Sequence, residues 1–187
     1  MPFDFKRAYA RLGPLSPYAA QDIPTRLRST DLVHRFETGQ IEPEQFVQEL
    51  AAVLEFNITY AEFCELWSCV FLPETLVPDA LIASLATRYR LLVLSNTNAI
   101  HFPMLRSRYP ILGHFHGFVL SYEVGAAKPS ARIYQEAIRQ AGCSAAECFF
   151  TDDIPLYVEA AREQGMDAVQ FQSAAQIESE LRSRGAL

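Results

Sequence analysis

The sequence has 187 residues, of which 50% are hydrophobic and 20% are charged, as in an ordinary globular protein with one good core. Its formal net charge of −6 argues against a broad surface for nucleic acid or for anionic membranes. No apolar run approaches the roughly 18 residues of a membrane-spanning helix, and the first residues lack the apolar stretch of a signal peptide. We expect a cytoplasmic protein, a monomer or a weak homodimer, with neither nucleic acid nor a membrane as a partner.

The first part of the chain, residues 1–75, has helical periodicity and no convincing strand. Residues 44–54 and 60–71 each place apolar side chains on one helical face, including Leu50 in the first segment and Trp67 in the second. Segments that contain proline or glycine separate these pieces. We therefore expect a small helical domain over this part of the chain.

From residue 76 to residue 187, predicted helices and strands alternate. The strand candidates are short apolar runs at residues 91–94, 118–120, 148–151 and 168–171. The helix candidates are amphipathic segments at residues 79–89, 130–141, 155–164 and 174–184. The first of these helices is expected to turn Leu85 and Tyr89 inward. Apolar strands separated by helices predict a doubly wound α/β domain, with a parallel sheet covered on both faces and the helical domain attached as a lid.

The cysteine and histidine residues give no strong indication of a disulfide framework or of a metal site. The four cysteines form no Cys-x-x-Cys pair and lie among apolar neighbours, at Cys64, Cys69, Cys143 and Cys148. This pattern favours reduced, buried thiols over disulfides or zinc. The His-x-His pair of His114 and His116 has no third ligand nearby in the sequence, and we interpret both residues as part of a loop.

Three polar clusters each follow a predicted strand and precede a predicted helix: Ser95-Asn96-Thr97, Lys128 and Asp152-Asp153. Because the carboxyl ends of parallel strands meet at one edge of a sheet, these clusters are expected to lie together. A carboxylate pair holds a hard cation such as Mg²⁺. A lysine neutralises phosphoryl oxygens, while a hydroxyl and an amide orient them. The arrangement is typical of a magnesium-dependent phosphoryl site.

Each cluster also has a simpler interpretation. Asp152 or Asp153 fits as a cap of the helix that follows, since acidic side chains favour the first turn of a helix. Ser95 and Asn96 are common helix caps as well, and Lys128 taken alone is a solvated loop residue. The occurrence of all three clusters in this order is what favours the phosphoryl site.

The segments around these clusters resemble motifs II, III and IV of the haloacid dehalogenase-like (HAD) hydrolases, which are mostly phosphatases. Three short sequences are similar to motifs of the subgroup that includes α-D-glucose-1-phosphate phosphatases: Ser-Asn-Thr-Asn, Lys-Pro-x-x-x-Ile-Tyr and Phe-x-Asp-Asp. The DFKRAY and ETGQIEPEQF segments are similar to the four-helix cap of that subgroup. The resemblance implies a Rossmann-like core with a helical cap. It also implies a Mg²⁺-dependent phosphatase of small phosphorylated metabolites, such as sugar phosphates, that works through an aspartyl-phosphate.

The resemblance further implies roles for individual residues. It makes Lys128 and Ser95 catalytic, with Lys128 balancing the charges of nucleophile and phosphate. The implied substrate contacts are Ser95, Asn96, Thr97 and Lys128, and the implied magnesium ligands are Asp152 and Asp153. One departure is Tyr157, where related sequences often carry asparagine.

The nucleophile of this family belongs to an apolar strand that ends in Asp-x-Asp before the cap, and no such strand is found in the sequence. Met1 already lies in the segment that resembles the first cap helix, so we expect a truncated chain. The central strand, between those that end at Ser95 and Asp152, is expected to be absent. Asp4 is a poor alternative nucleophile, because no apolar strand precedes it and Lys6 stands where a second carboxylate is needed. We expect such a chain to lack normal turnover.

Two other functions remain open from the sequence. One is a 2-haloacid dehalogenase on the same fold, with carbon in place of phosphorus as the electrophile; the Asp152-Asp153 pair favours metal and therefore phosphate. The other is a catalytically silent phosphate-binding protein, which the missing nucleophile favours. No general rule links the residues of the helical domain to a particular substrate, so the sequence does not identify the substrate.

Overall fold

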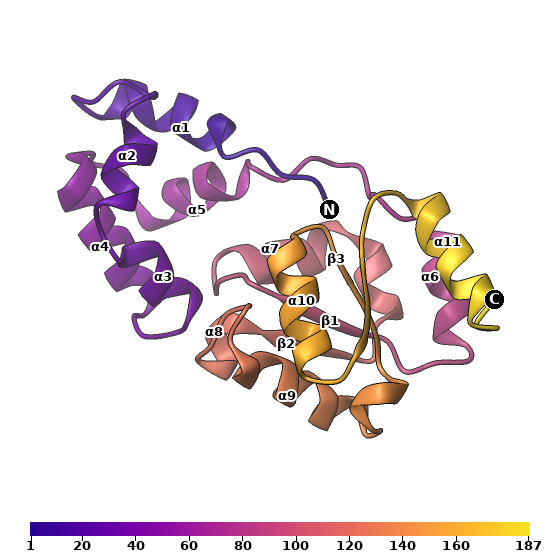
Figure 1. The fold of residues 1–187 in the computed structure, drawn as a ribbon. Helices are drawn as coiled ribbons and strands as arrows, with labels where there is room; N and C mark the ends of the chain where they lie inside the picture. The colour runs from indigo at the N-terminus through magenta and orange to yellow at the C-terminus, as the bar shows by residue number, and fades with distance from the viewer.

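The computed structural model describes residues 1–187 and has two lobes, a helical lobe and an α/β lobe (Figure 1). The helical lobe contains α1 (Lys6–Leu12), the 3₁₀-helix η1 (Gly13–Leu15), α2 (Ile23–Arg28), α3 (Leu32–Glu37), α4 (Pro43–Leu54) and α5 (Tyr60–Ser68). These are five α-helices, whereas the resemblance implied four. Every helix of the molecule is too short or too polar to span a bilayer.

The helical lobe is held together by aromatic packing. Its core is a cluster of 17 buried residues that runs from Ala8 to Val70 and includes Ile100 of the other lobe. The rings of Phe36 and Phe46 stack with centroids 4.2 Å apart, and Phe46 lies 5.7 Å from Trp67. Burial of rings this large supplies most of the driving force for packing short helices that would be marginal alone.

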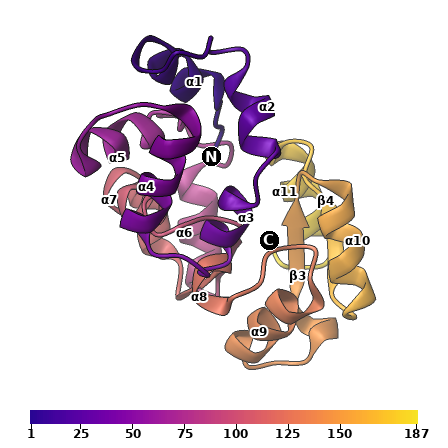
Figure 2. The same ribbon diagram turned by 90° about the vertical axis from the view of Figure 1, so that its left-hand side faces the viewer.

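The α/β lobe alternates helices and short strands. Its helices are α6 (Asp79–Ala86), α7 (His101–Arg108), α8 (Ser121–Val124), α9 (Ala131–Ala141), α10 (Pro155–Glu163) and α11 (Ala174–Ser183), with the 3₁₀-helices η2 (Pro110–His114) and η3 (Ala145–Glu147). Its strands are β1 (Leu92–Ser95), β2 (Gly117–Leu120), β3 (Phe149–Asp152) and β4 (Asp167–Gln170). α9 packs against β1 and β2, and α10 packs against β3 and β4 (Figure 2). The parallel α/β architecture predicted from the sequence is confirmed.

The four strands form two separate parallel pairs. β1 pairs with β2 and β3 pairs with β4, so no ladder joins β1 to β3. All four residues of β1 are only partly buried, although they are apolar up to Ser95, because one edge of the strand has no neighbour. The sheet is divided at the place where the sequence predicted a central strand to be absent.

Local details correct two expectations. Tyr89 lies beyond the end of α6 and is 39% exposed, while Leu85 is buried as expected. All four cysteines are free thiols, but none is fully buried: Cys143 is exposed and the other three are partly buried. Sγ of Cys143 lies 3.6 Å from Sγ of Cys148. Cys143 directly follows Gly142, whose left-handed φ of 75° ends α9 and turns the chain to the surface.

Gly39 and His101 make two of the contacts between the lobes. Gly39, just past α3, has a left-handed φ of 65° and packs so tightly against α8 that a Cβ there would lie 2.0 Å from the main-chain oxygen of Tyr122. On the other side, Nε2 of His101 in α7 donates a hydrogen bond of 3.1 Å to the main-chain oxygen of Trp67 in α5. These contacts bring the C-terminal end of α3 toward the α/β lobe.

We expect Gly39→Ala to destabilise the protein more than Gly142→Ala does. Both alanines are forced into the left-handed region, at a cost of about 1–2 kcal/mol. A Cβ at Gly142 meets nothing within 4 Å, whereas at Gly39 it collides with the main chain of Tyr122. Urea unfolding of the two variants measures the difference, and equal losses of unfolding free energy would show that this lobe contact is loose.

Candidate active site

A buried ion pair joins the carboxyl ends of β1 and β3. Nζ of Lys128 donates hydrogen bonds to the main-chain oxygen of Leu94 in β1, at 3.2 Å, and to Oδ2 of Asp152 in β3, at 2.5 Å. The side chains of Lys128 and Asp152 are only 7% and 10% exposed. The ammonium group therefore bridges the two strand pairs at the edge where the sequence predicts a binding site for an anion.

The loop that carries Lys128 is held by Asn96. Oδ1 of Asn96 accepts a hydrogen bond of 2.7 Å from the main-chain N–H of Lys128, and its Nδ2 donates to the main-chain oxygen of Lys128 at 3.0 Å. The resemblance implies that Asn96 contacts the phosphoryl group, and this stays a prediction. In the structure its amide fixes the backbone of Lys128.

Ser95 and Thr97 differ in their freedom to bind a ligand. Oγ of Ser95 makes one long contact, 3.4 Å to the main-chain oxygen of Asn96, so this hydroxyl is available. Thr97 is buried, and its main-chain N–H donates to Oγ of Ser121, which in turn donates to the main-chain oxygen of Thr97, both at 3.0 Å. The sequence analysis missed Ser121, whose only signal is a polar residue directly after an apolar strand.

The two carboxylates after β3 have different environments. Oδ1 of Asp152 accepts a hydrogen bond of 2.9 Å from the main-chain N–H of Ile154, and its Oδ2 binds Lys128. Asp153 is exposed. No cluster of three metal-ligating side chains is present. Mg²⁺, however, is commonly held by one or two carboxylates together with phosphate oxygens and water, so this donor pair fits that ion.

Tyr157, on α10, lies at the centre of the site. Its hydroxyl accepts a hydrogen bond of 3.4 Å from Nδ2 of Asn96, and Nζ of Lys128 lies 5.1 Å from the centroid of its ring. Burial, and next the negative charge of Asp152, raise the pKa of this hydroxyl. The phenol therefore stays neutral and offers the lysine an aromatic face.

The strand-end loop is also tied to the helical lobe. Oδ1 of Asn98 accepts hydrogen bonds from the main-chain N–H groups of Ile100 and His101, at 3.1 and 2.9 Å. Nδ1 of His101 lies 3.1 Å from Nδ2 of Asn98, which fixes Nδ1 as the acceptor and Nε2 as the donor to Trp67. Burial lowers the pKa of His101 to about 4, so this residue is a neutral link between the lobes.

Glu37, the last residue of α3, is the carboxyl group that the sequence analysis missed. Burial raises its pKa to about 7, and the structure gives it no ion-pair partner. Its negative charge contributes to the raised pKa of Tyr157, behind burial and Asp152. In sequence it looks like an ordinary acidic residue at the end of a helix.

Three other candidates have local roles. Oδ1 of Asp4 accepts a hydrogen bond of 2.9 Å from the main-chain N–H of Lys6, the first residue of α1, which is a local contact two residues along the chain. His114 and His116 do not share a site. Nε2 of His114 lies 3.1 Å from Oδ1 of Asp79, whereas Nδ1 of His116 accepts from the main-chain N–H of Leu91.

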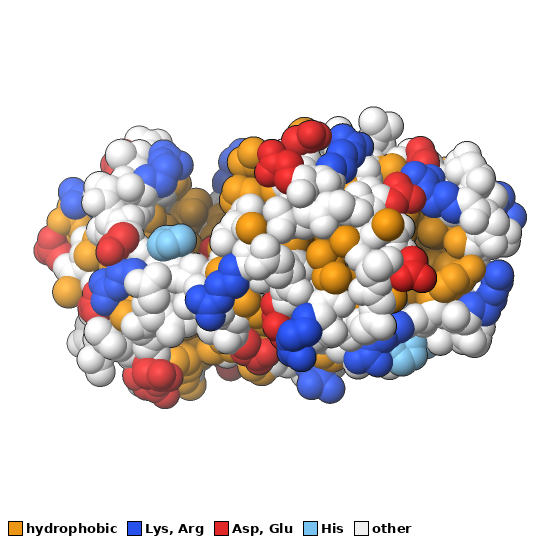
Figure 3. Space-filling view, turned by 60° about the horizontal axis from the view of Figure 1, so that its bottom comes forward, with side chains coloured by type: hydrophobic (Ala, Val, Ile, Leu, Met, Phe, Trp, Pro, Cys, Tyr) orange, Lys and Arg blue, Asp and Glu red, His pale blue; other side chains and the backbone are white.

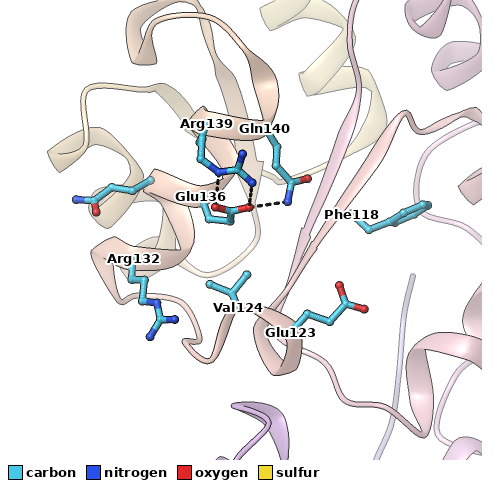
Figure 4. Close-up of a pocket in the computed structure, with 8 residues that line it drawn as sticks. Phe118, Glu123, Val124, Arg132, Glu136, Arg139 and Gln140 are labelled. Atoms are coloured by element: carbon cyan, nitrogen blue, oxygen red, sulfur yellow. Dashed lines mark hydrogen bonds and ion pairs between the residues drawn. The ribbon is translucent and has the colours of Figure 1, made fainter.

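The hollow between α8 and α9 lies away from these strand ends. A notch separates the two lobes in the space-filling view, where acidic and basic side chains are interspersed (Figure 3). A hollow of about 560 Å³ lies between α8 and α9 (Figure 4). There the carboxylate of Glu136 is already bound by Arg139 and Gln140, which satisfies its charge.

Removing one partner of the buried ion pair is expected to lower the unfolding free energy more than replacing both partners together. Asp152→Asn leaves the Lys128 ammonium buried without a counter-charge, and we expect a loss of about 3–5 kcal/mol in unfolding free energy. Adding Lys128→Met should recover part of this loss. The surface control Glu136→Gln, which faces an Arg139 side chain that is 71% exposed, should cost at most about 1 kcal/mol. If urea unfolding shows that the losses of unfolding free energy in the two single variants simply add up in the double variant, this account is contradicted.

The raised pKa of Glu37 predicts a pH dependence of stability. The folded state holds this proton up to about pH 7, whereas the unfolded chain releases it near the ordinary glutamate value of 4.5. Unfolding free energy is therefore expected to fall as the pH rises between these values. Glu37→Gln should flatten this part of the profile, while the exposed Glu163→Gln should leave it unchanged. Identical profiles for wild type and Glu37→Gln would contradict the placement of Glu37.

Comparisons with known proteins agree with this arrangement. A model of the haloacid dehalogenase-like hydrolases matches residues 5–165. The D-ribitol-5-phosphate phosphatase of Bacteroides thetaiotaomicron is 25% identical over 169 residues, covering 86% of this chain and 82% of that protein. The sesquiterpene phosphatase astK of Aspergillus oryzae is 29% identical over 153 residues, covering 78% of this chain and 74% of that protein.

A solved structure has the same fold. It is a HAD family enzyme of Bacteroides thetaiotaomicron in complex with magnesium and inorganic phosphate, with a TM-score of 0.80 and 23% identity. The match covers 92% of this chain and 88% of that one. With a family model that matches most of its length, the chain belongs to the haloacid dehalogenase-like hydrolases.

Proposed function

We propose that this hydrolase acts on phosphomonoesters of small metabolites, in a Mg²⁺-dependent reaction at the carboxyl ends of β1 and β3. The observation that carries the proposal is the position of Lys128. Its Nζ is buried between Leu94 of β1 and Asp152 of β3, beside a free serine hydroxyl. With Mg²⁺ held by the carboxylate pair, the metal and the buried ammonium group would together favour a multiply charged anion over a neutral ligand.

The residues of the chain divide the work of binding the phosphoryl group. Lys128 neutralises its oxygens, and the Ser95 hydroxyl donates a hydrogen bond to one of them. Asn96 positions Lys128 through the two hydrogen bonds to its main chain. Asp152 and Asp153 would hold Mg²⁺, which would supply further positive charge against the phosphoryl oxygens. The family resemblance implies a carboxylate nucleophile and an aspartyl-phosphate.

The relatives support small phosphorylated substrates. One is named for a polyol phosphate and another for a sesquiterpene phosphate, so the common element in both names is the phosphate. The solved neighbour with magnesium and inorganic phosphate supports the pairing of a metal with an anion at this kind of site. The leaving group is the variable part of the substrate.

Binding of Mg²⁺ and inorganic phosphate tests the proposal without requiring turnover. In isothermal titration calorimetry, phosphate is expected to bind more tightly when Mg²⁺ is present. Asp153→Asn should weaken Mg²⁺ binding by about tenfold or more, because a charge-assisted contact is lost. Glu163→Gln, the same change of a carboxylate to an amide at an exposed position of α10, should have no effect.

The same measurements separate the alternative functions. Binding of a 2-haloalkanoate that needs no Mg²⁺, together with no binding of phosphate, would overturn the proposal in favour of a dehalogenase. Binding of Mg²⁺ and phosphate without release of phosphate from any monoester would favour a silent binding protein.

A further inference from the structure

A second hollow lies at the junction of the two lobes, between α1, α5 and α7. Its volume is about 560 Å³, and none of the polar residues at the strand ends lines it. In this region α5 packs against both α1 of the helical lobe and α7 of the α/β lobe (Figure 2). A ligand in this hollow would therefore touch both lobes.

Each of the three helices presents to the hollow a pair of side chains four residues apart. The pairs are Arg7 and Arg11 on α1, Cys64 and Ser68 on α5, and Met104 and Arg108 on α7. Residues at this spacing lie on the same face of a helix. Phe71 and Ile100 add further apolar surface, so the lining of the hollow is partly basic and partly apolar.

The charge of the hollow is opposite in sign to the charge of the protein. The whole chain has a formal net charge of −6. The hollow, in contrast, is lined by three arginines and one acidic residue, Glu65. The arginines that form ion pairs in the structure are others: Arg35, Arg139, Arg162, Arg182 and Arg184. The guanidinium groups of the hollow are therefore free to bind an anion.

Helix structure does not account for all three of these arginines. Arg11 and Arg108 lie in the last turns of α1 and α7, where the helix dipole favours a positive charge. Arg7 lies in the first turn of α1, where the dipole disfavours a positive charge. It is also repelled by Arg11, four residues further along the helix. A bound anion would compensate both of these unfavourable interactions.

The hollow also contains a buried hydroxyl group without a partner. Ser68, the last residue of α5, is only 5% exposed and lines the hollow. A serine in a helix can donate to the main-chain oxygen four residues earlier, but the hydroxyl of Ser68 makes no such bond and opens to the hollow. Because buried polar groups usually have a hydrogen-bond partner, this hydroxyl indicates that a ligand supplies one.

We propose that this hollow binds a small organic anion with an apolar body. The acidic group of the ligand meets the three arginines and accepts a hydrogen bond from Ser68, while its body lies against Phe71 and Met104. A guanidinium group binds a phosphate, carboxylate or sulfonate through paired hydrogen bonds. The volume suits one small molecule. Since Arg7 belongs to the helical lobe and Arg108 to the α/β lobe, the ligand holds the two lobes together.

Fluorescence titration with anilinonaphthalene sulfonate, an aromatic body with one sulfonate group, tests the proposal. We expect it to bind at least about tenfold more tightly than phenylnaphthylamine, the same body without the sulfonate, because charge-assisted hydrogen bonds are lost in the amine. Arg7→Gln and Arg108→Gln should each weaken binding of the sulfonate about tenfold and leave binding of the amine unchanged. Ser68→Ala should weaken binding of the sulfonate several-fold. The matched control is Arg106→Gln, in the same turn of α7 as Arg108 but outside the hollow, and it should change neither affinity.

Protection of thiols locates the bound probe. Cys64 and Cys69 line the hollow and are partly buried, whereas Cys143 is exposed and lies elsewhere. The sulfonate is expected to slow alkylation of Cys64 and Cys69 by iodoacetamide, measured for each cysteine by mass spectrometry. The rate at Cys143 should stay the same.

Four outcomes would overturn the proposal. The first two are no binding of the sulfonate to the wild type, and equal affinity for the sulfonate and the amine. The third is an affinity for the sulfonate that is unchanged in both Arg7→Gln and Arg108→Gln. The fourth is displacement of the sulfonate by Mg²⁺ with inorganic phosphate, because the probe would then occupy the proposed active site.

Discussion

The ion pair between Lys128 and Asp152 is the interaction on which the α/β lobe depends. β1 and β3 share no ladder of hydrogen bonds. Besides the apolar core that Val119 and Phe150 share, this ion pair links the two strand pairs at their carboxyl ends. Nζ of Lys128 satisfies both a main-chain oxygen at the end of β1 and a carboxylate at the end of β3. The group best suited to bind a phosphoryl ligand is therefore also a structural link.

The loops around this pair are ordered by small polar side chains rather than by apolar packing. Asn96 binds the main chain of Lys128 on both sides, and Ser121 binds that of Thr97 on both sides. Hydrogen bonds of this kind fix loop backbones that lack the repeating bonds of helices and strands. The positions of the charged groups are consequently set by the main chain before any ligand arrives, which is the condition for electrostatic preorganisation.

Much of this architecture was predictable from local pattern. Each predicted strand lies within one residue of an observed one, because apolar runs between helices have few alternatives once the helices pack. The predicted grouping of Lys128 with Asp152 followed from the rule that parallel strands end at one edge. The approach of Tyr157 to Asn96 and Lys128 was not predictable, since it depends on how α10 packs beside the loops that follow β1 and β2. The hydrogen bonds between the Asn96 amide and the main chain of Lys128 were not predictable either, because no spacing of residues in the sequence indicates them.

The unpaired edges of β1 and β3 have a consequence for association between molecules. A strand edge with free N–H and C=O groups is a template for pairing with another chain, and natural proteins often protect such edges with charged residues, especially lysine. Lys128 lies between these edges and donates to the last free oxygen of Leu94. A foreign strand that entered the gap would have to bury or displace this ammonium group. The cost of burying or displacing a charged group therefore opposes edge-to-edge pairing at the point where β1 and β3 end.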